Sequence, residues 1–333
     1  EGASLSGLGT ISINEGANVH LLGTVSSDFL EVAQGAILRV HGHYSPTSTV
    51  VSGGAIRFAN SSTIADIAGS SLIVRDGGKV DVYVVPTSPQ SSVELPKTFT
   101  VDGGLVNLAS GIFEVANFNL IRPSASALPG SGDRHQNILQ VNGTLAVLLS
   151  YTWEAGLIAG SGKELSVLHF PATTSGTLSS TSAKFLREIT LTNEGTMNWE
   201  DGNMNLQVGA SIRNDMGTIT IGSATGIQNN AMFLLWSDHQ DRYPTFENKA
   251  GSVVHLHLPS ANTHRFEIEG LMQNFGDIVV EGDGTLCFSE GGRLAHHDGA
   301  TLTLQGSSVL EFAGTLATAG EAIPANELYS GSA

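Results

Sequence analysis

Short segments of alternating apolar and polar residues recur along this chain, and each follows a tight turn rich in Asn and Gly. The clearest copy has Asn193 and Gly195 in its turn and continues into the alternating segment Thr196–Trp199. The pattern starts again at Gly217, which lies 22 residues beyond Gly195. Alternation with a period of two predicts strands with one buried face, and a fixed period of roughly 20 to 50 residues is typical of repeat proteins.

The length of the repeat determines the predicted fold class. Each 22-residue unit has room for three short strands separated by turns. Sandwiches and hairpin barrels also contain many short strands, but they rarely repeat an Asn/Gly turn in one phase. We therefore predict an all-β, right-handed, single-stranded parallel β-helix with three short strands per coil of about 20 to 25 residues. We expect it to form one continuous solenoid over residues 1–318.

Several segments interrupt the repeat. Loop insertions are expected at 84–98, 122–137, 170–184 and 223–247, and a flexible tail or linker at 319–333. Insertions project from one face of a solenoid and often carry its specific function.

The alternation also predicts which side chains fill the interior, because the second and fourth residues after a turn Gly should point inward. The expected interior residues are Ile11, Ile13, Leu145, Val147, Met197, Trp199, Ile219, Ile221, Ile278, Val280, Leu286 and Phe288, with Leu302 and Leu304 added by alternation. The same rule turns Cys287 outward, as an inert surface or groove thiol, because no neighbouring base completes a reactive site. A single cysteine also excludes an intrachain disulfide framework.

Four asparagines occupy a similar phase of the repeat, two or three residues before a Gly. They are Asn193, Asn214, Asn248 and Asn274, and the glycines are Gly195, Gly217, Gly251 and Gly276. Asn tolerates left-handed backbone angles, and its amide can bond to nearby backbone groups. We expect these residues to form turns and an internal ladder of stacked amides rather than a ligand site.

Composition narrows the range of partners. Asp and Glu number 31 against 15 Lys and Arg, a formal net charge of −16. Repulsion from phosphates argues against binding to nucleic acid or to anionic membranes. The sequence has no apolar run long enough for a transmembrane helix, so direct membrane insertion is not expected. Its polar positions are filled mainly by Ser, Thr, Asn and Gly, which indicates an extracellular or cell-surface location.

Parallel β-helices resemble the pectate lyase and polygalacturonase superfamily, which implies carbohydrate cleavage as a function to be tested. The glycosidases of that group carry Asn-Thr-Asp, Asp-Asp and Gly-His-Gly motifs, and the lyases use basic residues beside calcium-binding carboxylates. This chain has only His41-Gly42-His43 as an echo of the His motif, and Lys and Arg are scarce. We therefore expect no enzyme activity, with polysaccharide binding or degradation as the alternative.

Histidine and acidic residues offer three weak metal-site candidates. His255 and His257 share one face of a predicted strand, His296 and His297 precede Asp298, and a third group lies in the 223–247 insertion at Asp238, His239 and Asp241. A zinc site needs three or four ligands in a closed arrangement, and none of these spacings requires one. We expect surface polar residues here, and neither a metal nor another cofactor.

Two sequons make Asn60 and Asn142 candidate N-glycosylation sites in a secreted eukaryotic protein. Asn60 precedes Ser61-Ser62, and Asn142 precedes Gly143-Thr144. Ordinary turn residues are the alternative interpretation of both.

A longer pattern covers residues 150–222. It has Trp153, Gly156 and a Gly-Ser-Gly at 160–162, followed by Leu-x-Asn-x-Gly-x-x-x-Trp over residues 191–199. This pattern resembles the repeats of filamentous-haemagglutinin-type β-helical adhesins and related giant extracellular proteins. The resemblance implies a structural or adhesive module of a larger surface protein or filament. Its expected partners are other proteins, or copies that associate through the β-helix ends, with glycans as a further class.

Overall fold

The computed structural model describes residues 5–58, 67, 69–83, 92–121, 137–162, 166–222, 232–236, 244–258, 265–289, 291–313 and 315–317. The protein is all-β, and 65% of the described residues lie in strands that make about 11 turns of a parallel β-solenoid. Among the described residues, no helix is long and apolar enough to cross a membrane. The chain divides into two compact units, Glu1–His169 (unit 1) and Phe170–Ala333 (unit 2). A single continuous solenoid over residues 1–318 stays a prediction.

Unit 1 contains the first sixteen strands, and its boundary falls inside the last of them. The strands are β1 (Leu5–Ser6), β2 (Thr10–Ile13), β3 (Asn18–Leu21), β4 (Val25–Ser26), β5 (Phe29–Val32), β6 (Ile37–Val40), β7 (Ser48–Ser52), β8 (Ala55–Phe58), β9 (Ser71–Arg75), β10 (Lys79–Val82), β11 (Ser92–Glu94), β12 (Thr98–Asp102), β13 (Leu105–Leu120), β14 (Ile138–Trp153), β15 (Gly156–Ala159) and β16 (Val167–Phe170).

The first coils of unit 1 have two full strands each and a much reduced third side. Strands β2, β5, β7, β9 and β12 pair in parallel, as do β3, β6, β8 and β10. On the third side, Val25, Tyr44 and Ile67 are joined only by isolated parallel bridges. These coils are therefore simpler than the three-strand coil that the repeat predicts.

Strands β13 and β14 are 16 residues long, far longer than the short strands expected from the sequence. Successive parts of β13 pair with β10, β11 and β12, so one strand covers three sides of a coil. Its pairing with β14 shifts register between Ala109 and Ile112 and between Val115 and Asn117. Such irregularities bend a strand, because an extra residue on one side increases the local twist. Corners are thus made here by bends rather than by turns.

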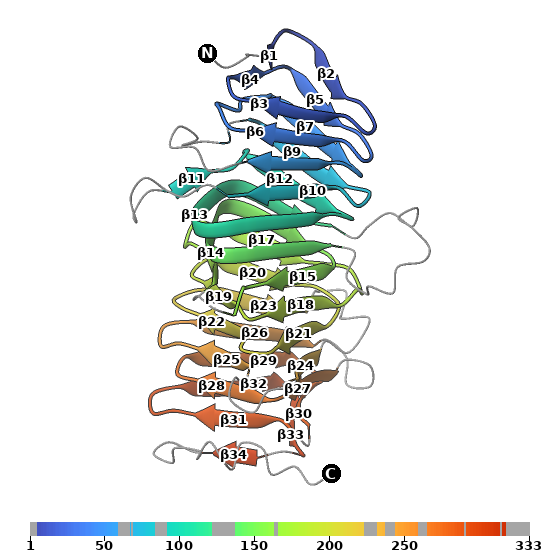
Figure 1. Cartoon of the computed structure of the whole chain (residues 1–333). Coiled ribbons are helices and arrows are strands. Elements are labelled where there is room, and N and C mark those ends of the chain that lie inside the picture. The colour runs from blue at the N-terminus through green and yellow to red at the C-terminus, as the bar shows by residue number, and fades with distance from the viewer. Residues whose placement is uncertain are drawn as a thin grey trace. The chain divides into compact units, whose positions relative to one another are not determined.

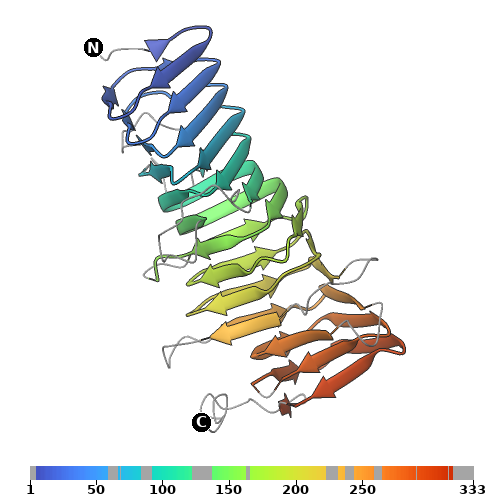
Figure 2. The same cartoon turned by 90° about the vertical axis from the view of Figure 1, so that its right-hand side faces the viewer.

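Unit 2 follows the predicted three-strand coil. Its strands are β17 (Ser175–Leu178), β18 (Lys184–Arg187), β19 (Thr190–Asn193), β20 (Thr196–Trp199), β21 (Met204–Gln207), β22 (Ser211–Asn214), β23 (Thr218–Ile221), β24 (Met232–Trp236), β25 (Thr245–Asn248), β26 (Val253–Leu258), β27 (Arg265–Glu269), β28 (Leu271–Asn274), β29 (Asp277–Gly282), β30 (Thr285–Phe288), β31 (Arg293–His296), β32 (Thr301–Gly306), β33 (Val309–Phe312) and β34 (Thr315–Ala317). Each strand from β17 to β31 pairs in parallel with the third strand after it, as in β19–β22, β22–β25, β25–β28 and β28–β31. Figure 1 shows β22, β25, β28 and β31 one beneath another, and Figure 2 shows the strands of successive coils stacked on one another within each unit.

The interior of the coils is apolar, as the alternation predicts. Of the fourteen expected interior residues, eleven are buried, including Trp199, which makes an edge-to-face contact with Phe266 at a ring-centroid distance of 5.5 Å. The exceptions lie in β2 and β32: Ile11 and Leu302 are only half-buried, and Leu304 is 44% exposed. Strands β2 and β32 each pair with a strand on one side only among the described residues, so their inward side chains lack a covering coil.

The expected insertions have mixed outcomes. Segment 170–184 contains β17, which pairs in register with β20 and so belongs to the regular coil. Its Ser/Thr-rich composition hid the alternation because Gly176 occupies the inward position that Met197 fills in the next coil. Strand β24 lies within 223–247 and pairs with β21, whereas the flanking residues 223–231 and 237–243 are outside the described part. Most of 84–98 and 122–137, and all of 319–333, also lie outside it.

Candidate functional site

The four predicted asparagines form one column inside unit 2. They end strands β19, β22, β25 and β28 in matching register, and all four are 0% exposed. The Nδ2 of Asn193 donates a hydrogen bond to Oδ1 of Asn214 at 2.8 Å, Asn214 donates to Asn248 at 3.0 Å, and Asn248 donates to Asn274 at 2.8 Å. We call this column the asparagine ladder.

Each amide of the ladder also bonds to a backbone carbonyl at the corner of the coil. The acceptors of these Nδ2 groups are the carbonyls of Gly195, Val253, Asp277 and Thr301, at 3.2, 3.1, 3.0 and 3.2 Å respectively. Both hydrogens of each NH2 group therefore have an acceptor. A buried amide that lacked these partners would be costly, so the ladder holds successive corners in one register.

The ladder has a direction, and its two ends differ. Asn274 Nδ2 lies 3.2 Å from Nδ1 of His296, whose Nε2 lies 3.1 Å from the carbonyl oxygen of Ala300. Because Asn274 is the donor, Nδ1 of His296 must accept and Nε2 must carry the proton. At the other end, Oδ1 of Asn193 is buried and has no hydrogen-bond partner among the described residues. Because every amide donates to the next residue in the column, no amide donates to the side-chain oxygen of the first one, Asn193.

His296 is thus the last rung of the ladder, whereas the sequence suggested a surface residue or weak metal ligand. It pairs in register with Asn274, 22 residues earlier, and both of its ring nitrogens are engaged. The spacing and the nearby Gly299 repeat the phase of the asparagines, so a search for any polar residue in that phase would have found it. The adjacent His297 stacks on Phe275 at 3.8 Å.

This geometry predicts different outcomes for two substitutions of His296. His296→Asn keeps an acceptor in line with Asn274, so the free energy of unfolding should change by less than about 0.5 kcal/mol. His296→Leu leaves that donor with one partner fewer and should lower the free energy of unfolding by about 1–2 kcal/mol. Urea denaturation followed by circular dichroism measures both. Equal losses for the two variants would contradict the proposed end of the ladder.

Three of the four corner glycines lie where a side chain has no room. A Cβ added at Gly195 would lie 2.2 Å from the Thr174 carbonyl oxygen, and at Gly276 it would lie 2.3 Å from that of Lys249. At Gly217 it would lie 2.5 Å from Nδ2 of Asn193. None of these three has a positive φ, so close approach between coils, not backbone conformation, requires glycine there.

Gly251 differs from the other corner glycines, because its φ of 82° lies in the left-handed region. The four asparagines, by contrast, have extended strand backbone. Tolerance of left-handed angles, on which their prediction partly depended, is therefore not what places them. Their side chains point inward at the end of each strand, where an apolar residue would leave corner carbonyls without donors.

The two candidate glycosylation sites stay predictions. Asn60 lies outside the described residues. Asn142 is half-buried in the middle of β14, where it pairs with Ala109, and its Oδ1 is buried.

His255 and His257 lie on the outer face of β26, on either side of the buried Leu256, as the alternation predicts. Both approach one oxygen of Glu281 on β29: Nε2 of His255 lies 3.0 Å and Nδ1 of His257 lies 3.5 Å from Oε2. Within the described part of the chain, no three His, Cys, Asp or Glu side chains are arranged to hold a metal ion. Asp238, His239 and Asp241 lie outside that part.

Cys287 points away from the interior, between the inward residues Leu286 and Phe288, yet it is fully buried. Its thiol is covered by Arg265, whose Nη2 lies 2.7 Å from Sγ and whose guanidinium also pairs with Glu311 at 2.7 Å. Burial raises the pKa of Cys287 above its ordinary value, and the positive charge of Arg265 offsets only part of this effect. The predicted outward orientation of Cys287 is confirmed. The predicted surface position is wrong, because the thiol is buried beneath Arg265.

The covered position of Cys287 predicts slow chemical modification. At pH 8 the folded protein should react with a thiol reagent at least about 100-fold more slowly than the unfolded chain, because little thiolate forms and the reagent cannot reach it. Arg265→Ala should raise this rate by roughly tenfold, whereas Arg213→Ala, on another exposed side chain, should leave it unchanged. Stopped-flow labelling measures the rates. Equal rates for the two variants would show that Arg265 does not cover the thiol.

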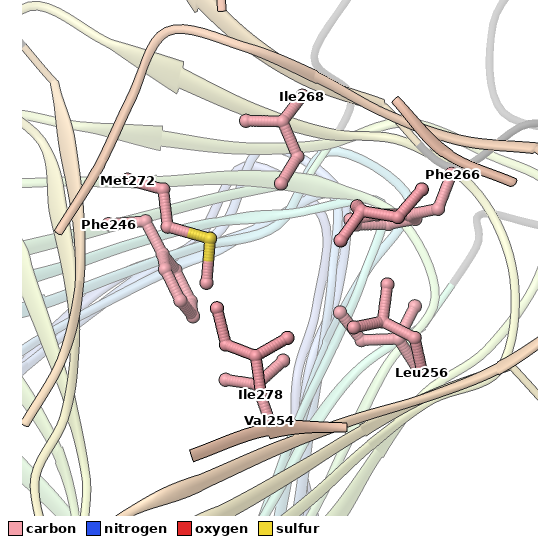
Figure 3. Close-up of a pocket in the computed structure, with 9 residues that line it drawn as sticks. Phe246, Val254, Leu256, Phe266, Ile268, Met272 and Ile278 are labelled. Atoms are coloured by element: carbon pink, nitrogen blue, oxygen red, sulfur yellow. The ribbon is translucent and has the colours of Figure 1, made fainter. Parts of the chain in front are cut away.

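The interior of unit 2 also contains a small apolar cavity (Figure 3). Its lining residues are Ile221, Phe246, Val254, Leu256, Phe266, Ile268, Met272, Ile278 and Leu286. The cavity has a volume of about 10 Å³, close to the smallest volume that can hold one water molecule. Since the lining offers no polar partner, the cavity should stay dry and is too small for a ligand.

Comparison of this chain with protein families, with curated proteins and with solved structures finds no match.

Proposed function

We propose that this protein is an extracellular structural or adhesive β-solenoid module of a larger surface protein or filament. The observation that carries the proposal is the asparagine ladder. A buried, one-way column of amides joins four successive corners through bonds of 2.8 to 3.0 Å. Such a column holds the coils in register and rigidifies the stack, which suits a scaffold that displays a constant surface.

The outer surface supports the same proposal. In the sheet built from β20 and β23, the outward positions Thr196, Asn198, Thr218 and Thr220 carry short polar side chains. Together with the resemblance of residues 150–222 to haemagglutinin-type repeats, this favours partners that recognise a regular polar face or stack on a coil. The net charge of −16 disfavours nucleic acid as a partner.

The competing proposal is binding or cleavage of polysaccharide, for which exposed aromatic rings are the usual platforms. Trp153 and Trp199 are each 1% exposed and serve the interior. Phe275 is also occupied, because His297 stacks on its ring at 3.8 Å and the ammonium of Lys249 lies 5.1 Å from its centroid. These contacts favour the structural role over sugar stacking.

Electron microscopy of the purified chain over a range of concentrations tests the structural role. We expect particles that associate end to end as concentration rises, because β32 and β33 each pair on one side only among the described residues. A glycan array and a reducing-sugar assay with pectic substrates should both be blank. Isolated particles at every concentration, together with a positive result in either assay, would replace the structural proposal by the carbohydrate one.

A further inference from the structure

A lysine ammonium is buried between two corners of unit 2. Lys184 begins β18 and is 0% exposed. Its Nζ donates hydrogen bonds to the carbonyl oxygens of Ser180 at 3.0 Å, Ser182 at 3.1 Å and Asp201 at 3.0 Å. An ammonium has three N–H donors, so each has a carbonyl acceptor. Two of these carbonyls precede β18, and the third precedes β21, which pairs with β18 in the next coil.

The backbone around the ammonium has a shape that few sequences adopt. Ser180 has a φ of 72°, which is uncommon for a residue with a side chain, and Gly202 has a φ of 78°. A Cβ at Gly202 would lie 2.5 Å from the carbonyl oxygens of both Ser180 and Ser182 and 2.8 Å from Nζ of Lys184. The carbonyl of Gly202 accepts a hydrogen bond from Nε1 of the buried Trp199 at 2.9 Å, which holds this corner in place.

The three carbonyl oxygens surround the ammonium as protein oxygens surround a bound cation. Backbone carbonyls are typical oxygen ligands of hard cations, and a buried charge is tolerated only when its donors are satisfied. Without the ammonium between them, the carbonyl oxygens of Ser180, Ser182 and Asp201 would lie close together and would lose the hydrogen-bond donor that they share. Their mutual repulsion would open the contact between the two corners.

We propose that the Ser180–Ser182 corner and the Asp201-Gly202 corner form a cation site, which Lys184 fills with its own ammonium. The same site binds a free primary ammonium ion when the lysine side chain is shortened. The proposal assigns Lys184 the role of a tethered cation that joins adjacent coils. It is independent of the proposed function, since it depends only on the contacts of unit 2.

Chemical rescue tests the site in the full chain. Lys184→Ala removes the part of the side chain that n-propylammonium would replace. We expect this variant to lose about 10 °C in Tm and to regain more than half of that loss in roughly 100 mM n-propylammonium chloride, because a ligand that binds only the folded state stabilises it. Tetramethylammonium chloride, which has no N–H donor, and sodium chloride at the same concentration should restore nothing.

A matched control is Lys79→Ala, since Lys79 Nζ lies 3.3 Å from Asp81 while its side chain is 39% exposed. Its Tm should be the same in all three salts. Full stability of Lys184→Ala without added amine, or equal recovery in all three salts, would overturn the proposal.

A second test remains decisive if Lys184→Ala does not fold. In the unaltered protein, 15N-resolved NMR should detect one lysine ammonium whose protons exchange slowly with water, because carbonyls occupy all three N–H groups. The signal should disappear in Lys184→Met, which keeps the unbranched side chain up to the ε position and removes the ammonium. The absence of any protected lysine ammonium, or a Lys184→Met variant with unchanged Tm, would overturn the proposal.

Discussion

Asn214→Leu should lower the free energy of unfolding by about 4 kcal/mol, one of the two largest losses that we expect. Asn214 accepts a hydrogen bond from Asn193 and donates to Asn248 and to the Val253 carbonyl. Leucine branches at the same carbon and is larger than asparagine, so the loss reflects polar groups left without partners rather than a cavity. Each unsatisfied buried group costs about 1–3 kcal/mol, and the substitution affects three of them at once.

Urea denaturation followed by circular dichroism measures this loss, and Asn198→Leu provides a matched control. Asn198 lies on β20, between the inward-facing Met197 and Trp199, and is directed outward. Its substitution should change the free energy of unfolding by less than about 0.5 kcal/mol. Similar losses for the two variants would mean that the ladder contributes no more than any surface asparagine.

Gly217→Ala is the second substitution with a large expected effect, a loss of about 3 kcal/mol or more. The added methyl group would lie 2.5 Å from Nδ2 and 2.6 Å from the carbonyl oxygen of Asn193, and 2.9 Å from Oδ1 of Asn214. The carbonyl belongs to the backbone of the previous coil, so it cannot rotate away. The corner must open, and overpacking of this kind is destabilising.

Gly291→Ala is the control for Gly217→Ala, because a Cβ at Gly291 would have no atom within 4 Å and its φ is not in the left-handed region. That variant should have the Tm of the unaltered protein or a slightly higher one, since alanine restricts the unfolded chain. Differential scanning calorimetry of the two variants measures the contrast. If Gly217→Ala is as stable as Gly291→Ala, the corners tolerate more separation than the structure indicates.

The asparagine ladder shows how far sequence reasoning reaches at this site. Asn193, Asn214, Asn248 and Asn274 were predicted to stack because they recur in one phase of the repeat. In the structure, hydrogen bonds of 2.8 to 3.0 Å join successive members of this set. The fifth rung, His296, was assigned to the surface, because only the register of β28 and β31 shows that it continues the column.

Lys184 and Cys287 illustrate what the sequence did not reveal. A lysine at the start of a strand is usually solvated, and the carbonyls that surround its ammonium include one from the next coil. Cys287 has the orientation that alternation predicts, but Arg265, on the preceding coil, and Glu311, on the following coil, cover it. Both environments depend on which residues lie one coil away.

The sequence by itself determined the all-β parallel solenoid, the three-strand coil of unit 2 and most of the interior residues. These follow from period-two alternation and the spacing of turns, which are local properties of the chain. The tertiary structure alone decided the bent 16-residue strands β13 and β14, the regular strand β17, the polarity of the ladder and the cation site at Lys184. Each depends on at least one contact between adjacent coils, where small offsets in coil length decide which atoms meet. A repeat pattern specifies the average coil, and the stacking of particular coils specifies what each side chain touches.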